Sequence, residues 1–141
     1  MITRFEDLRV DAELPSLSRT VTREDVRAYA DASGDQNPLH QNDDLALSVG
    51  FPGIIAHGMF TMGHLATCVA EWADGPANIL RLSAQFRVPV LMGEDIVAGG
   101  RVRAINNDTQ TAIVELWVTV NRDGSSVFAI RKGEAEVRFS N

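Results

Sequence analysis

The sequence predicts an α+β fold in which an antiparallel β-sheet wraps around one long central helix. The stretch Met59–Trp72 holds no proline and is apolar over most of a helical wheel. The half of the chain that follows is rich in valine, isoleucine, threonine and aromatic residues, interrupted by short turn sequences. A sheet of this kind needs a cover for its apolar face, and this helix is long and apolar enough to provide it. We expect a single domain over residues 1–141.

Three shorter elements are expected before the central helix. Residues Leu17–Val21 add an edge strand. Thr22 and Asp25 have the spacing of a helix cap, so a short helix is expected to lead from them to Gly34. Asn42–Val49 is expected to form another short helix, with acidic residues in its first turn.

The central helix is expected to be nearly buried, with a single polar stripe. The stripe consists of Thr61, His64, Thr67 and Glu71. We expect His64 to face solvent, a partner subunit or buried water. The sequence Asp-Gly-Pro after Trp72 and Ala73 ends the helix.

Four successive antiparallel strands are expected after this helix. They cover Ser83–Leu91, Ile96–Ile105, Thr111–Asn121 and Ser126–Phe139. The last three are joined by the polar turns Asn106–Asp108 and Arg122–Ser125. Pro89 lies inside the first of the four and indicates an edge or a bulge there.

Composition narrows the classes of function. The formal net charge of −6 argues against nucleic acid and against anionic membrane surfaces as partners. No segment approaches the roughly 20 apolar residues that cross a bilayer, and the first residues lack the apolar core of a secretory signal, so a cytoplasmic location is expected. Cys68, the single cysteine, is expected to be a buried thiol without a catalytic role.

Two motifs carry the chemistry. The first runs from Ala30 to His40 and reads A-D-A-S-G-D-Q-N-P-L-H. Gly34 tolerates a positive φ angle and Pro38 restricts the residue before it, so the loop should be rigid. A folded-back loop of this length can aim Asp35 and His40 at one water molecule. On its own, the motif favours a well-capped turn with a surface histidine, and only a second motif favours an active site.

The second motif, A-H-G-M-F, opens the central helix at Ala56–Phe60. Together the two motifs resemble the signature of the MaoC-like, or type 2, enoyl-CoA hydratases, which have the hotdog fold. Three further features resemble those of mycobacterial 3-hydroxyacyl-carrier-protein dehydratases. They are the length of the chain, the T-M-G sequence after the second motif, and a V-P-V strand. The resemblance covers essentially the whole chain and is strong from Tyr29 to Gly63.

This resemblance implies reversible hydration of a trans-2-enoyl thioester to an (R)-3-hydroxyacyl thioester. Asp35 and His40 would share a water molecule and handle both proton transfers. The backbone N–H of Gly58 would donate to the thioester carbonyl oxygen. Asn37, Gly34 and His57 would support the site. No metal and no cofactor is expected, because CoA or carrier-protein phosphopantetheine arrives as part of the substrate.

The family further implies a homodimer, or a heterodimer with a second hotdog subunit. Candidate contacts for the phosphates of the substrate are Arg81, Arg87, Arg101, Arg103, Arg131 and Lys132. Two alternative functions stay open at this point, an acyl-thioester hydrolase and a noncatalytic acyl-binding subunit. Acyl-chain length and pathway are not fixed by the sequence.

Overall fold

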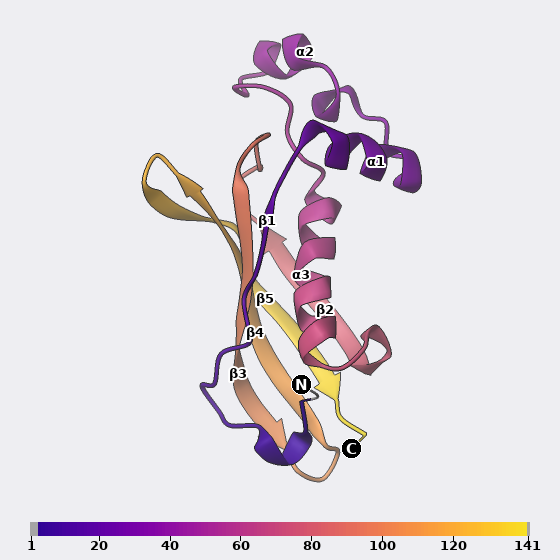
Figure 1. Ribbon diagram of the computed structural model, residues 1–141, viewed down its shortest axis with the longest axis vertical. Helices are drawn as coiled ribbons and strands as arrows, with labels where there is room; N and C mark the ends of the chain where they lie inside the picture. The colour runs from indigo at the N-terminus through magenta and orange to yellow at the C-terminus, as the bar shows by residue number, and fades with distance from the viewer. Residues whose placement is uncertain (1–2, 141) are drawn as a thin grey trace.

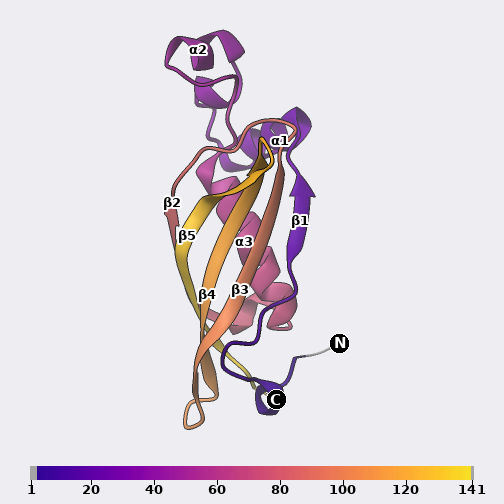
Figure 2. The same ribbon diagram turned by 90° about the vertical axis from the view of Figure 1, so that its left-hand side faces the viewer.

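The computed structural model describes residues 3–140, in which five antiparallel strands form one sheet around one long helix (Figures 1 and 2). The strands are β1 (Leu17–Thr20), β2 (Ile79–Phe86), β3 (Asp95–Asn106), β4 (Thr111–Arg122) and β5 (Ser125–Arg138). The helices are α1 (Arg23–Ser33), α2 (Asp43–Ser48) and α3 (Gly58–Trp72), with short 3₁₀ turns η1 (Phe5–Asp7), η2 (Pro38–His40) and η3 (Pro76–Asn78). The expected α+β architecture is confirmed.

The order of the strands differs from the expected succession. The sheet runs β1-β3-β4-β5-β2, so the strand that follows α3 lies at one edge beside β5, and β1 lies at the other edge beside β3. Only β3, β4 and β5 follow one another as hairpins, through the expected polar turns. Residues 87–94 carry the chain from β2 to the far side of β4 and β5. Strand propensity indicates that a segment is extended, but it does not specify its neighbour.

Strand β2 also begins and ends earlier than expected. It runs from Ile79 to Phe86 rather than from Ser83 to Leu91, so Pro89 lies in the loop beyond it. Proline has no N–H to donate to a ladder, which agrees with its place outside the strand. Leu91 is extended for a separate reason, because it forms an isolated bridge with Ile55 at the entrance to α3.

The core lies between α3 and the sheet. Thr61, Leu65, Cys68 and Val69 are the buried residues of α3, and they face a continuous set of buried valine, leucine and isoleucine side chains from β3, β4 and β5. Alternation along β4 buries every second residue from Ala112 to Val120. The expectation of a nearly buried helix is only half right, because Met59 is 56% exposed and the stripe through Gly63 and Thr67 is open.

The polar stripe on α3 is divided. Thr61 is buried among the residues of α3 that pack on the sheet, whereas Thr67 and Glu71 are exposed. The His64 ring instead reaches the edge strand, where its Nε2 lies 2.8 Å from the backbone oxygen of Leu17. That carbonyl is the partner of one ring nitrogen of His64, and the half-buried ring also lines a cavity beside β1. None of the helices among residues 3–140 is long and apolar enough to cross a membrane.

Residues 22–54 form a projecting segment that stands beyond one end of the sheet and of α3 (Figure 1). Thr22 and Asp25 form the expected capping box, and Gly34 ends α1 with a φ of 80°. Asn42 caps α2. Because both short helices begin and end where the sequence indicates, the loop between them is fixed at its two ends.

Candidate active site

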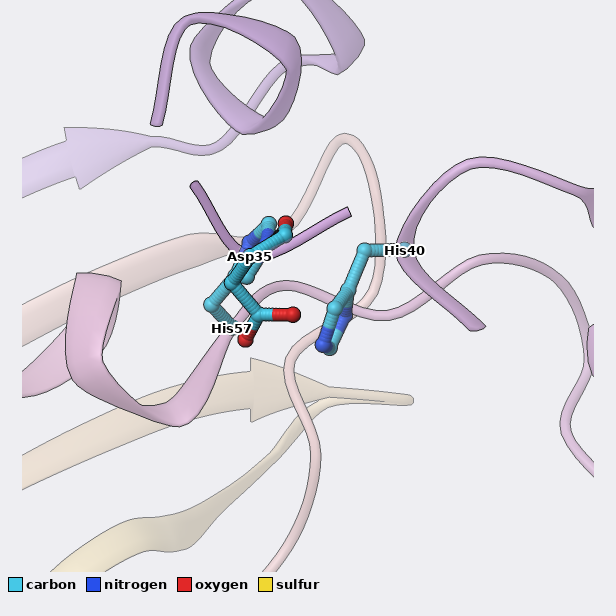
Figure 3. Close-up of side chains that lie close together, drawn as sticks. All are labelled: Asp35, His40 and His57. Carbon is cyan, nitrogen blue, oxygen red and sulfur yellow. Dashed lines mark hydrogen bonds between the residues drawn. The ribbon is translucent and has the colours of Figure 1, made fainter. Parts of the chain in front are cut away.

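The loop between α1 and α2 brings Asp35 next to the start of α3 (Figure 3). The Asp35 Oδ1 accepts a hydrogen bond from the backbone N–H of Asn37 at 3.2 Å. The Asn37 side chain in turn accepts from Leu39 N–H at 3.0 Å and caps η2, which carries His40 at its end. Asn37 therefore stiffens the turn, as expected, and the Asp35 carboxylate remains exposed.

His40 is oriented by one short contact. Its Nδ1 lies 2.6 Å from the backbone oxygen of Ile55, which can only accept a hydrogen bond. Nδ1 therefore carries a proton in both charge states of the ring, and Nε2 is the nitrogen that gains or loses one. Metal ligands and general bases are commonly fixed by such a bond on the other ring nitrogen.

His57 lies behind this pair and is only 2% exposed. Its ring stacks on the His40 ring with centroids 3.8 Å apart and an angle of 27° between the planes. Its Nε2 lies 3.0 Å from the backbone oxygen of Asp35. Sequence reasoning placed His57 among the supporting residues, as a helix cap or a partner of a backbone carbonyl; the second of these is what the structure shows, and the stacking on His40 was not identified.

Ligand-type atoms of Asp35, His40 and His57 lie within 4.8 Å of one another. Such a group could hold a metal ion. The Nε2 of His57 is engaged by the backbone oxygen of Asp35, and its buried Nδ1 has no hydrogen-bond partner among the described residues. Because that free nitrogen is buried, the groups of the cluster that are open to a water molecule are the Asp35 carboxylate and the His40 Nε2.

Gly58 is the first residue of α3, and it lines a cavity of about 230 Å³ together with His40. A helix leaves its first N–H groups without intrahelical acceptors, and the positive end of the helix dipole lies there. A Cβ atom built on Gly58 would lie 3.3 Å from the Phe86 ring, so a larger residue would crowd this entrance. The backbone N–H of Gly58 is therefore a hydrogen-bond donor beside this cavity.

The rest of this cavity comes from residues far away in the sequence. Its wall includes Thr61 on α3, Ala129 on β5 and the residues 86–90 that leave β2. Sequence reasoning did not identify Phe86 or Thr61 as site residues. No local signal marks Phe86, because its place depends on β2 lying beside β5.

Among the six cations considered for phosphate contacts, only Arg87 lines this cavity. Arg81 and Arg103 both pair with Glu134. The other three, Arg101, Arg131 and Lys132, line a separate depression beside Trp117 and Phe128.

A second cavity, of about 480 Å³, lies between α3 and the edge strand β1. It is lined by His64, Thr67 and Glu71 and contains none of the three predicted catalytic groups. Cys68 is buried behind this helix face, as expected, and burial followed by the nearby negative charge of Glu71 raises the pKa of its thiol to about 11.

The chain is similar to known proteins in sequence and in structure. Residues 9–123 match the family model described as MaoC like domain. An (R)-specific enoyl-CoA hydratase of Rhodospirillum rubrum is 34% identical over 95 residues, which is 67% of this chain and 65% of that protein. A mitochondrial 3-hydroxyacyl-[acyl-carrier-protein] dehydratase of Arabidopsis thaliana is also 34% identical, over 88% of this chain and 74% of the relative.

The matched regions do not always extend over the relatives. They cover 65%, 57% and 27% of the length of three of the curated relatives. Among solved structures, an (R)-hydratase from A. caviae involved in PHA biosynthesis superposes with a TM-score of 0.85 at 27% identity, over 95% of this chain and 98% of that one. The sheet and helix therefore form the hotdog fold, and the chain belongs to the MaoC-like family.

Proposed function

We propose that this protein catalyses the reversible addition of water to a trans-2-enoyl thioester, giving a (R)-3-hydroxyacyl thioester, within fatty-acid metabolism. The observation that carries the proposal is the placement of Asp35 close to His40, which lines one cavity together with Gly58, the first residue of α3. Relatives named as hydratases and dehydratases support it, since they catalyse the two directions of one reaction. Whether hydration or dehydration predominates depends on which of the two thioesters is supplied.

The acid/base pair is arranged for a water nucleophile. When His40 is neutral, its Nε2 is an acceptor, because Nδ1 donates to Ile55. The Asp35 carboxylate is also an acceptor. A water between them would donate one O–H to each, so its lone pair would point away from both groups and toward C3 of the substrate.

The chemical step balances without any redox group. The water oxygen bonds to C3, one water proton passes to the Asp35 and His40 pair, and the electron pair of the double bond moves toward the thioester oxygen. The Gly58 N–H would stabilise that oxygen, a contribution of typically about 3 kcal/mol for one preorganised donor. Return of the proton to C2 completes the hydration. The reverse order of steps is dehydration.

The substrate carrier is proposed to leave the cavity along residues 86–90. Arg87 is the cation at this exit, so it is our candidate contact for a phosphate of CoA or of a carrier-protein phosphopantetheine. The CoA or phosphopantetheine carrier is part of the substrate, and the proposed reaction uses no metal and no separate cofactor. Dialysis against a chelator should leave turnover unchanged.

We further propose a dimer, either of two copies or with a second hotdog subunit. Strand β2 is an edge of the sheet, with unpaired backbone groups, and Leu80 and Phe86 on it are 43% and 50% exposed. Met59, at the start of α3, is another exposed apolar side chain. Light scattering of the purified chain distinguishes a homodimer from a monomer that awaits a partner. A cytoplasmic location stays a prediction from composition.

The test is loss of enoyl absorbance when the protein is mixed with crotonyl-CoA and longer enoyl thioesters. We expect Asp35→Asn and His40→Gln each to lower turnover by ~10²- to 10⁴-fold while the far-ultraviolet spectrum is retained. Asp44→Asn, which removes an exposed carboxylate in the same projecting segment, should leave turnover intact. Release of free thiol in place of hydration would identify a thioesterase, and no turnover of any thioester would overturn the proposal.

A further inference from the structure

The proposed reaction does not use the buried imidazole of His57. Its Nε2 lies 3.0 Å from the backbone oxygen of Asp35. A carbonyl oxygen can only accept, so Nε2 must carry the hydrogen. This contact fixes the tautomer of the ring, which a sequence motif cannot reveal.

The other nitrogen of His57 indicates its charge. Nδ1 is buried and, among residues 3–140, has no hydrogen-bond partner. Aromatic rings enclose the imidazole on two sides, His40 at 3.8 Å and Tyr29 at 4.8 Å between centroids. A proton on Nδ1 would place a positive charge and an unpaired donor in this enclosure, which is unfavourable. The ring is therefore neutral.

His57 also connects the three working parts of the site. It precedes Gly58 directly in the chain, donates to the main chain of Asp35, and supports the flat face of His40. The distance between the oxyanion donor and the acid/base pair thus depends on one rigid ring. An error of about 1 Å in such a distance can lower a rate ~10²-fold.

We propose that His57 is a positioning residue, a neutral Nε2–H imidazole that holds Asp35 and His40 in place relative to the Gly58 N–H. The expected effect on turnover rests on the proposed function. The tautomer is inferred from the geometry alone. A simple packing role would require only a side chain of similar size.

Three variants separate the hydrogen bond from the packing. In His57→Gln the amide nitrogen takes the place of Nε2, so the donor to Asp35 is kept. In His57→Asn the amide nitrogen reaches only the place of Nδ1, so the donor is lost from a side chain of the same chemistry. His57→Phe keeps the stacked ring and removes the donor.

We expect kcat to fall ~10²-fold in His57→Asn and His57→Phe and to stay within about fivefold of wild type in His57→Gln, with KM changed less than kcat. His64→Gln, in the separate cavity between α3 and β1, serves as the control and should keep wild-type kcat. Thermal unfolding of each variant reports packing separately. Equal losses in Gln and Asn, or no loss in Phe, would overturn the positioning role.

Nitrogen-15 correlation spectra of the wild-type protein at neutral pH test the tautomer directly. We expect His57 to show a protonated Nε2 and a bare Nδ1. A charged ring, or a proton on Nδ1 alone, would contradict the inference even if every variant failed to fold. A wild-type protein that shows this tautomer but hydrates no thioester would instead overturn the proposed function.

Discussion

The sheet and α3 are held together by many buried apolar side chains, whereas the projecting segment buries few. In β4 alone, five side chains from Ala112 to Val120 are buried, whereas α1 buries Val26 and Ala30 and α2 buries Ala46. Yet Asp35 and His40 both lie on the projecting segment. The acid/base groups therefore lie where apolar packing is weakest, and polar contacts to the entrance of α3 must hold them.

This difference suits a substrate site. A loop exposed at its tip can admit a thioester, and the first turn of α3 supplies a fixed donor. The two regions meet at residues 55–58, where Ile55 accepts from His40 and Ala56 donates to Val90 at 2.8 Å.

The largest expected effect compares two leucines. Leu116 is fully buried on β4, and Leu47 on α2 is 55% exposed. Leu116→Ala should lower the free energy of unfolding by about 2–5 kcal/mol, because it leaves a cavity in the core. Leu47→Ala should change it by less than about 0.5 kcal/mol. Urea unfolding measures both, and similar values for the two variants would refute the contrast unless a dimer covers Leu47.

The second comparison uses two glycines of α3. Gly58→Ala adds a methyl group 3.3 Å from the Phe86 ring at the proposed oxyanion site, so turnover should fall at least ~10-fold. Gly63→Ala meets nothing within 4 Å and should stabilise the helix by roughly 0.5–1 kcal/mol. Steady-state kinetics and thermal unfolding are measured on both. A fully active Gly58→Ala protein would argue against the assigned donor.

A smaller effect concerns the loop between β2 and β3. Burial raises the pKa of Glu94, but hydrogen bonds from Arg122 and from the Leu91 N–H outweigh it, so the pKa lies below its ordinary value. Arg122 also donates to the backbone oxygen of Pro89 in the cavity wall. These contacts join the loop to the end of β4.

Glu94→Gln should therefore lower the free energy of unfolding by about 1 kcal/mol at pH 7. A carboxyl with a lowered folded-state pKa stabilises the fold above its unfolded pKa and loses this contribution as pH falls through the folded value. The gap between wild type and variant should close below about pH 4. Urea titrations across pH 3–7 measure it, and a gap independent of pH would contradict an ionic contribution.

The smallest expected effect is at Cys68. Its pKa, raised to about 11, leaves almost no thiolate at pH 8, and its Sγ lies within α3 against the sheet. A thiol reagent should label the native protein far more slowly than the protein in urea. Rapid labelling without denaturant would show that α3 separates from the sheet more readily than its burial indicates.

Much of the fold could be predicted from local patterns. The cap formed by Thr22 and Asp25, the turn at Gly34 and the extent of α3 each depend on neighbouring residues, and all three are confirmed. The neighbours of β2 could not be predicted, because strand pairing depends on contacts between distant segments. Thr61 was grouped with Thr67 and Glu71 in one polar stripe, although it is buried and they are exposed, since a helical wheel does not reveal which side the sheet covers.

By itself the sequence determined the residue types of the site and their local supports. Asp35, Asn37, Pro38 and His40 form a loop whose turn chemistry is contained within it. Only the tertiary structure decided which groups meet: the stacking of His57 on His40, the Phe86 ring at Gly58, and the edge position of β2. Local preferences act over a few residues, whereas these contacts form only when the whole sheet closes around α3.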